Sequence, residues 1–449
     1  MKKILPILLA LFAAGSLEPA ATALASVQID FDGSGGGSDA LPWGKFDAPG
    51  IGGLTGTDDR VWVELRADGP AERTRIATIG MAIESVEGNV VGGVADSELL
   101  GLLQNAGIEI IRTIPLSGFG PEDFPENDAA FHNYGEAEAA LKGLAAADPD
   151  HVQVIEIGKS LEGRAITALR FHGPGEKEKP GIVFFGAHHA REHLSTEVPL
   201  GIASWLAENR SRPEIAKLLK ERDVYFVPMV NPDGIEYDIA SGRYRWQRKN
   251  RRQNDDGSFG VDLNRNFDFR WGGRGASSRP GAGTYHGSSP FSEPESRAVR
   301  DFLTARPNIR IAVSYHSFSE LIMYPWGGAS EPISDGRALA AFRTMAQTMA
   351  GPTGYRPMQS ADLYIATGDT CDWAWAALKV FCFTFELTPK SQWQGGFYPG
   401  AGAIDSTVSK NLGSALYLID LADDPYRAGD GAPAAKLTTD RRNAWDAKL

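Results

Sequence analysis

The stretch "GAHHAREHL" at residues 186–194 places three histidines and a glutamate within nine residues. Imidazole nitrogens and carboxylate oxygens are common ligands of zinc, so this spacing predicts a metal site. His189, Glu192 and His193 spell His-x-x-Glu-His, a signature in which both histidines bind zinc from one helix face and the glutamate is a base. Alternatively, His189 and Glu192 are the only local ligands, and the third ligand and the base lie far away in the sequence.

The elements around this stretch favour the second interpretation. The preceding run "GIVFFGA" is β-branched, aromatic and bounded by glycine, which predicts a buried strand and not a helical turn. His189 then ends a strand, Glu192 lies near the first turn of the next helix, and His188 and His193 are expected to be structural. Because a catalytic zinc usually takes three protein ligands, a third must exist. His316, which ends the run "IRIAVSYHS", is the candidate, although a lone strand histidine is more often structural.

The N-terminus and the composition limit where the protein works. Lys2 and Lys3 precede the apolar run "ILPILLALFAAG", and "ALA" at 23–25 supplies small residues, which predicts a cleavable signal peptide over 1–25. The mature protein is therefore expected to be secreted or periplasmic, and not membrane-bound. A net charge of −12 over 449 residues argues against nucleic acid or an anionic membrane as the main partner.

The rest of the chain divides into three further regions. Residues 26–60 are rich in Gly, Asp and Ser, and residues 61–113 predict a small α+β unit. In that unit "RVWVELRA" and "TRIATIGMAIESV" predict strands, and Asp96 or Ser97 is expected to cap a helix that Gly107 stops. A long region of alternating strands and helices follows over 120–425, and residues 426–449 predict a polar tail.

The alternation over 120–425 predicts an α/β fold with a mixed, largely parallel twisted sheet and helices on both faces. "VYFVPMV" predicts a strand that ends at a turn, "NPDG", at 231–234. In such sheets the loops at the strand ends carry the site. The sequence does not decide whether the two cysteines, Cys371 and Cys382, pair.

Seven motifs in order carry a family resemblance: "HAREH" at 189–193, "NPDG" at 231–234, "RKNR" at 248–251, "DLNRNF" at 262–267, "SYHS" at 314–317, "LYIATGDTCDW" at 363–373 and "FTFE" at 383–386. Together they resemble the zinc carboxypeptidases of the A/B type, and the motif residues are most similar to those of bacterial carboxypeptidase T. The resemblance covers residues 120–425 and implies the carboxypeptidase-like fold. "VVGGVADSELLGLLQNAG" resembles the start of such enzymes' propeptides, which makes 26–119 a linker and propeptide-like region of a zymogen.

The resemblance implies one zinc ion per chain, held by His189, Glu192 and His316 with one position left for water. Two neutral imidazoles and one carboxylate leave the zinc a net positive Lewis acid, which lowers the pKa of bound water. Asp262 matches the carboxylate that orients His189. Glu386 ends the apolar strand "FCFTFE" and matches the general base that takes a proton from the water and passes it to the leaving amine.

Other motif positions match groups that hold the substrate. Arg248 corresponds to the arginine that stabilises the oxyanion, with Arg245 as an alternative because Gln247 breaks the usual Trp-Arg-Lys spacing. Asn264 and Arg265 match the pair that binds the substrate's terminal carboxylate, and Tyr364 closes over it; a planar guanidinium suits a carboxylate. Arg191 is expected to contact the substrate further from the scissile bond.

Two further positions bear on side-chain preference. Cys371 occupies the pocket position that is apolar in A-type and acidic in B-type enzymes. Asp369 matches an acidic residue of carboxypeptidase T, which predicts that apolar and also basic C-terminal residues are accepted. An alternative role for Asp369 is to cap the helix "TCDWAWAAL".

The predicted function is removal of single residues from peptide C-termini by a monomeric, zinc-dependent exopeptidase. One alternative is a peptidoglycan or γ-D-glutamyl amidohydrolase of the same fold. Another is a non-catalytic peptide-binding module, which the intact ligand and base positions argue against. Calcium is not predicted, although acidic loops such as "QNDDGS" could bind it.

Overall fold

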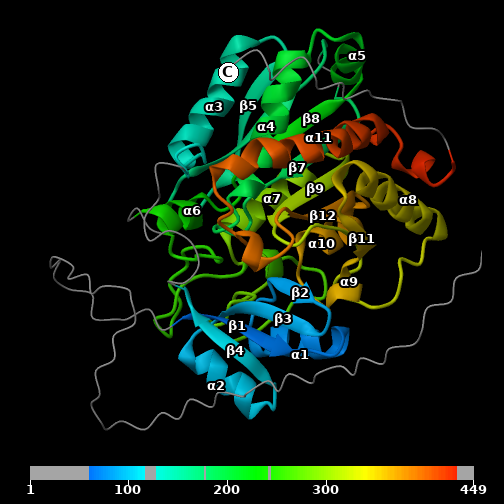
Figure 1. Ribbon diagram of the computed structural model, residues 1–449. Helices are drawn as coiled ribbons and strands as arrows, with labels where there is room; N and C mark the ends of the chain where they lie inside the picture. The colour runs from blue at the N-terminus through cyan, green and yellow to red at the C-terminus, as the bar shows by residue number, and fades with distance from the viewer. Residues whose placement is uncertain (1–59, 117–127, 176–177, 241–243, 432–449) are drawn as a thin grey trace, which may run out of the picture. The chain divides into compact units, whose positions relative to one another are not determined.

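Two separate sheets organise the protein (Figure 1). This computed structural model describes residues 60–116, 128–175, 178–240 and 244–431. The predicted signal peptide, residues 26–59 of the predicted linker and residues 432–449 of the predicted tail lie outside these ranges. The first sheet has four strands in the order β2-β3-β1-β4, and the second has eight in the order β11-β10-β12-β9-β7-β8-β6-β5.

Residues 60–116, here called the N-terminal unit, fold as a small antiparallel sheet with two helices. Its elements are β1 (Val61–Arg66), α1 (Pro70–Ile79), β2 (Ser85–Glu87), β3 (Val90–Ala95), α2 (Ser97–Asn105) and β4 (Ile110–Pro115). Asp96 caps α2 by accepting a hydrogen bond from the Leu99 amide at 2.8 Å, and Gly107 follows with φ 73°. The predicted strand "TRIATIGMAIESV" is wrong in its first half, which is the end of α1. Pro70 opens this helix, and burial of Ile76 and Ala77 against the sheet outweighs the β propensity of the run.

The eight-stranded sheet, here called the main sheet, confirms the mixed, largely parallel α/β prediction. Its strands are β5 (Val152–Lys159), β6 (Ala165–Phe171), β7 (Gly181–Phe185), β8 (Asp223–Val227), β9 (Ile309–Ser317), β10 (Leu321–Tyr324), β11 (Arg356–Gln359) and β12 (Phe381–Leu387). The neighbours β12, β9, β7 and β8 run parallel, whereas β10, β6 and β5 join by antiparallel pairing. The carboxyl ends of β7, β9 and β12 therefore meet at one edge.

Helices cover both faces of the main sheet (Figure 1). One face carries α3 (Tyr134–Ala147), α4 (Leu194–Asn209), α5 (Pro213–Glu221), α6 (Pro232–Ile239), α8 (Gly336–Thr353) and α11 (Ile404–Leu421). The other carries α7 (Pro294–Thr304) and α10 (Thr370–Leu378). In β7, Ile182 and Phe184 enter the first core while Val183 and Phe185 enter the second, as the two-residue period of a strand requires. Short elements near the site are η3 (Leu263–Arg265), α9 (Ser360–Leu363), η4 (Gln392–Gln394) and η5 (Ala401–Ala403).

Two boundaries differ from the sequence-based expectation. The predicted turn "NPDG" is the start of α6, where Asn231 caps the helix by accepting a hydrogen bond from the Gly234 amide at 3.0 Å. The predicted tail from 426 begins inside the packed chain, because η6 (Pro425–Ala428) buries Ala428 in the core. No helix in the described part of the chain is long and apolar enough to cross a membrane.

The N-terminal unit is held to the rest of the chain by side chains of α1. The Ile365 amide donates to Thr74 Oγ1 at 2.8 Å, and the Gly275 amide donates to Thr78 Oγ1 at 2.8 Å. Thr284 Oγ1 donates to the Ala77 carbonyl at 2.9 Å. These contacts fix the unit against the loops beyond the carboxyl ends of the parallel strands.

A disulfide between Cys371 and Cys382 joins the start of α10 to β12. Both cysteines are buried, and their Cα atoms are 4.9 Å apart. The bond ties the first turn of α10 to the strand that carries Glu386, and it answers the question of pairing that the sequence left open.

We expect Cys371→Ala combined with Cys382→Ala to lower the free energy of unfolding by about 3 kcal/mol, the order predicted by the loop-entropy model for a short closed loop. Urea unfolding followed by fluorescence measures the change. The free energies of unfolding of wild type and double variant should become equal when both are measured with a thiol reductant. Equal stability of the two proteins without reductant would contradict a stabilising role for the bond.

Candidate active site

Three ligand-type side chains converge at the edge where β7, β9 and β12 end. Glu192 Oε1 lies 2.7 Å from His189 Nδ1, and Glu192 Oε2 lies 2.9 Å from His316 Nδ1. The two Nδ1 atoms are 3.1 Å apart, and all three residues are buried. Within the described ranges, these three residues, here called the ligand group, have donor atoms close enough to share a metal ion.

The chemistry of this donor set fits zinc. Two imidazoles and one carboxylate in a buried pocket match the three-ligand pattern of catalytic zinc sites, which keep one position open. Burial alone would raise the pKa of Glu192, but His189 and His316 hold it below its ordinary value, so the carboxylate is ionised and ready to bind a cation.

Strand register explains why His316 and Glu386 meet. In the parallel pair β9 and β12, His316 is the direct partner of Glu386. Both point to the face of the main sheet that α10 covers, because Ala312 and Cys382, an even number of residues earlier, belong to that core. His189 joins them from the loop after β7. The ends of three parallel strands thus bring the three residues of the ligand group and a further carboxyl group to one place.

His193 lies outside the ligand group. It sits just before Leu194, the first residue of α4, so the stretch 189–193 is not a helix and its two histidines do not share a helix face. His193 Nε2 is 3.0 Å from Asp238 Oδ2, and its ring packs against Tyr244 and Tyr398. The geometry therefore disfavours the His-x-x-Glu-His alternative.

His188 is also outside the ligand group, although its ring packs against one member of it. Its ring is fully buried and stacks on His316 with centroids 5.6 Å apart. Burial, followed by the neighbouring His316 and His189, lowers the pKa of His188, so the ring is neutral. Its nitrogens contact Ser314 and Thr370, two residues that lie within the quoted motifs but to which the sequence assigned no role.

Asp262 connects the ligand group to Arg248. Its Oδ1 lies 3.0 Å from His189 Nε2, and its Oδ2 accepts from Arg248 Nη2 at 3.0 Å and Nε at 3.2 Å. Burial would raise the pKa of Asp262, but Arg248 and His189 hold it well below its ordinary value. The carboxylate thus orients the ring that would bind the metal and the guanidinium beside it. The alternative Arg245 instead lies over the Tyr237 ring, 4.5 Å from its centroid, and does not line the cavity.

Glu386 carries a carboxyl group in the same cavity. Burial raises its pKa well above the ordinary value, and the nearby carboxylates Glu192 and Glu84 raise it further. A carboxyl group with a raised pKa is a stronger base than an ordinary glutamate, as a residue that accepts a proton and passes it on must be.

A second group of side chains, here called the carboxylate clamp, consists of Asn264, Arg265 and Tyr364. Arg265 Nη2 donates to the Tyr364 hydroxyl at 3.3 Å, and Arg265 Nη1 donates to the Asn264 carbonyl at 2.7 Å. Arg265 Nε donates to the Gly275 carbonyl at 3.1 Å. Only 3% of Arg265 is exposed, yet no described carboxylate forms an ion pair with it. A buried guanidinium without a carboxylate partner is a strong site for an anion.

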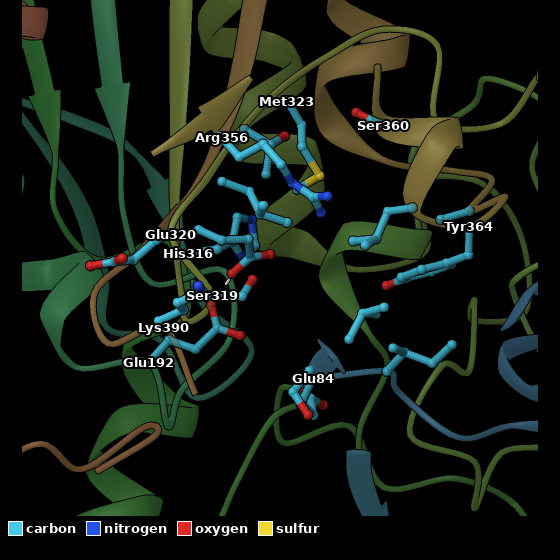
Figure 2. A pocket seen from close by; sticks show the side chains of 18 of the residues that line it. Glu84, Glu192, His316, Ser319, Glu320, Met323, Arg356, Ser360, Tyr364 and Lys390 are labelled. Atoms are coloured by element: carbon cyan, nitrogen blue, oxygen red, sulfur yellow. Dashed lines mark hydrogen bonds and ion pairs between the residues drawn. The ribbon is translucent and has the colours of Figure 1, made fainter. Parts of the chain in front are cut away.

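The ligand group, Glu386 and the carboxylate clamp line one cavity of about 670 Å³. Glu192 and His316 face it from the strand edge, whereas Tyr364 points into it from the opposite side and Glu84 enters from the N-terminal unit (Figure 2). Glu84 pairs with Arg191, and its Oε1 lies 3.6 Å from Arg248 Nη1. No motif pointed to Glu84, because its role depends on how the N-terminal unit docks.

Three further predicted positions have definite places. Asp369 lines the cavity; its Oδ1 caps α10 by accepting from the Cys371 amide at 2.9 Å, while its Oδ2 has no hydrogen-bond partner in the described structure. Cys371, expected in the side-chain pocket, does not line the cavity because its sulfur is bonded to Cys382. Arg191, expected to contact substrate, is engaged by Glu84 and lies over the Phe397 ring, 4.3 Å from its centroid.

Comparisons with known proteins agree with this arrangement. Residues 137–414 match the family described as zinc carboxypeptidase. The chain is 31% identical over 392 residues to a zinc carboxypeptidase of Saccharothrix mutabilis subsp. capreolus, with 82% of this chain and 90% of that protein covered. Identity to carboxypeptidase A2 of Mus musculus is 31%, covering 67% and 72%. The crystal structure of carboxypeptidase A from Helicoverpa armigera has the same fold, with a TM-score of 0.68 at 24% identity, covering 84% and 98%. Because the family match spans well over half of the sequence, this chain belongs to the zinc carboxypeptidase family.

Proposed function

We propose that this metallocarboxypeptidase removes single residues from the C-termini of peptides, with His189, Glu192 and His316 holding its zinc ion. Zinc, when bound, polarises a carbonyl group and makes water more acidic. The observation that carries the proposal is the buried Arg265 without a carboxylate partner, located in the same cavity as the ligand group. A cation buried at this place binds a free terminal carboxylate and thereby restricts cleavage to the last peptide bond.

Each remaining side chain has a distinct task. Arg265 and Asn264 bind the terminal carboxylate, and the Tyr364 hydroxyl beside Arg265 completes this contact. Arg248 is anchored through Nε and Nη2 to Asp262, which leaves Nη1 to donate to the carbonyl oxygen as negative charge develops on it. Glu386 takes a proton from the attacking water and passes it to the amine that leaves.

The position of Asp369 supports the proposal that both apolar and basic C-terminal residues of a substrate are accepted. One carboxylate oxygen caps α10, and the other lies without a partner at the cavity wall, 3.3 Å from the place where a Cβ on Gly327 would sit. The cavity is also lined by Met323 and Thr384, so it offers apolar surface to an aliphatic or aromatic side chain. A lysine or arginine side chain could pair with the free oxygen of Asp369.

The contacts of the N-terminal unit support the proposal that the intact protein is a latent precursor. Glu84 engages Arg191 and approaches Arg248, two cationic groups that a bound peptide would need. Tyr364 packs against the core of the same unit, which restricts its movement over a substrate. We infer a secreted or periplasmic zymogen with a signal peptide over 1–25, a linker and propeptide over 26–119, and a monomeric catalytic domain over 120–425.

Glu386→Gln is expected to lower kcat by roughly 10²–10⁴-fold while zinc remains bound, because the amide cannot move a proton but is not a ligand. Release of the C-terminal residue from peptides and metal content by atomic absorption are measured on the same samples. Glu331→Gln, at an exposed site, is the matched control and should keep full activity. Loss of zinc along with turnover would contradict the assigned role, and release from muropeptides alone would favour the amidohydrolase alternative.

Asp369→Asn should lower kcat/KM for C-terminal Lys and Arg peptides by roughly 10- to 100-fold and leave Leu and Phe peptides nearly unchanged. The asparagine Oδ1 keeps the helix cap, so the change removes charge and not structure. Burial raises the pKa of Asp369. Since only the ionised form attracts a cation, the ratio of Lys to Leu release in wild type should rise as the pH rises through this pKa. No measurable Lys or Arg release by wild type would refute mixed preference.

Glu84→Gln should raise the activity of the intact chain on short peptides by roughly tenfold, the size expected for weakening one charge-assisted contact. Limited proteolysis that removes the N-terminal unit should raise activity further, and the trimmed wild type and variant should then be equal. Glu109→Gln, an exposed glutamate of the same unit, is the control. Intact protein as active on large peptides as trimmed protein would contradict latency.

A further inference from the structure

A chain of hydrogen bonds runs beneath the cavity from the ligand group to the carboxylate clamp. Ser314 Oγ is 3.1 Å from His316 Nε2 and 3.3 Å from His188 Nδ1. His188 Nε2 is 3.3 Å from Thr370 Oγ1, which lies 3.0 Å from Asn264 Oδ1. All five residues are buried, so these groups must satisfy one another without bulk water.

When a metal occupies the ligand group, the hydrogen bonds of this series can run from donor to acceptor in one direction only. His316 turns Nδ1 towards Glu192 and His189, so a metal bound at Nδ1 leaves the ring proton on Nε2. Nε2–H then donates to Ser314 Oγ, and the Ser314 hydroxyl donates to His188 Nδ1. Because Nδ1 of His188 accepts this bond, the ring carries its proton on Nε2, from which it donates to Thr370 Oγ1. The Thr370 hydroxyl accepts this bond and donates its own single proton to Asn264 Oδ1.

The hydroxyl and the backbone amide of Thr370 together fix which end of the Asn264 amide faces the cavity. Asn264 Oδ1 also accepts from the Thr370 backbone amide at 3.0 Å, so the oxygen has two donors within the protein. Its Nδ2 is then the end available to donate to a substrate carboxylate. A reversed amide would present oxygen to that carboxylate and repel it.

We propose that Ser314, His188 and Thr370 are positioning residues that couple occupancy of the ligand group to binding of a carboxylate at Asn264. This rests on the proposed role of the carboxylate clamp. Such coupling is reciprocal: whatever factor metal adds to carboxylate affinity, the carboxylate adds to metal affinity. A purely structural role for His188, packing on His316 and Phe185, would produce no such link.

The test uses the intact chain and 3-phenylpropanoate, a small carboxylate that suits the cavity of about 670 Å³. Calorimetry measures its Kd in zinc-loaded and chelator-treated protein, and competition with a fluorescent chelator measures zinc affinity with and without the probe. In wild type we expect tighter probe binding with zinc. Thr370→Val and Ser314→Ala should each reduce this zinc-dependent ratio by about fivefold, the worth of one neutral hydrogen bond. The double variant should reduce it no further, because either change breaks the same chain.

Controls separate the outcomes. Thr370→Ser keeps the hydroxyl and should restore the ratio, whereas Thr367→Val removes a nearby hydroxyl bonded only to the Arg274 carbonyl and should not alter it. An unchanged ratio in Thr370→Val, or effects that multiply in the double variant, would overturn the coupling. If Arg265→Ala and Asn264→Ala bind the probe as tightly as wild type, the carboxylate clamp itself fails. If they weaken it while the Thr370 variants keep the wild-type ratio, only the coupling fails.

Discussion

The parallel register of β9 and β12 is the constraint on which the site depends. It sets His316 beside Glu386 and turns both side chains to one face, while β7 ends next to them and supplies the loop with His189 and Glu192. A slip of one residue would turn Glu386 into the opposite, aromatic core and leave the ligand group without a neighbouring acid. The centre of the main sheet therefore fixes His316 and Glu386 relative to each other, and the loop after β7 brings His189 and Glu192 to them.

Charge is balanced unevenly across the cavity. Asp262 and Arg248 neutralise each other, and Glu192 is held ionised by the two imidazoles. Arg265 remains without an acidic ion-pair partner in the described structure, and burial, together with the nearby Glu192 and Glu84, raises the pKa of Glu386. The cavity thus holds one buried cation without an ion-pair partner and one carboxyl group whose ionisation is opposed by its surroundings.

The sequence predicted the longer strands of the main sheet because they are apolar runs, whereas the four-residue strands β10 and β11 were not predicted. The order of the motifs also linked distant residues such as His189 and His316 to one metal site. Three features could not be predicted in this way. The α1 helix was hidden because its β-branched residues gain more from packing than local propensity costs. The Cys371–Cys382 bond depends on the separation of two Cα atoms, and the contacts of Glu84 and Thr370 depend on which loops meet, which no local pattern contains.

The contact of Glu84 with Arg191 and Arg248 has a further consequence for how firmly the N-terminal unit is held. All three side chains are buried, so each charge depends on the others for compensation. Removing the Glu84 carboxylate would leave two buried guanidinium groups with less compensation and would weaken the attachment of the unit.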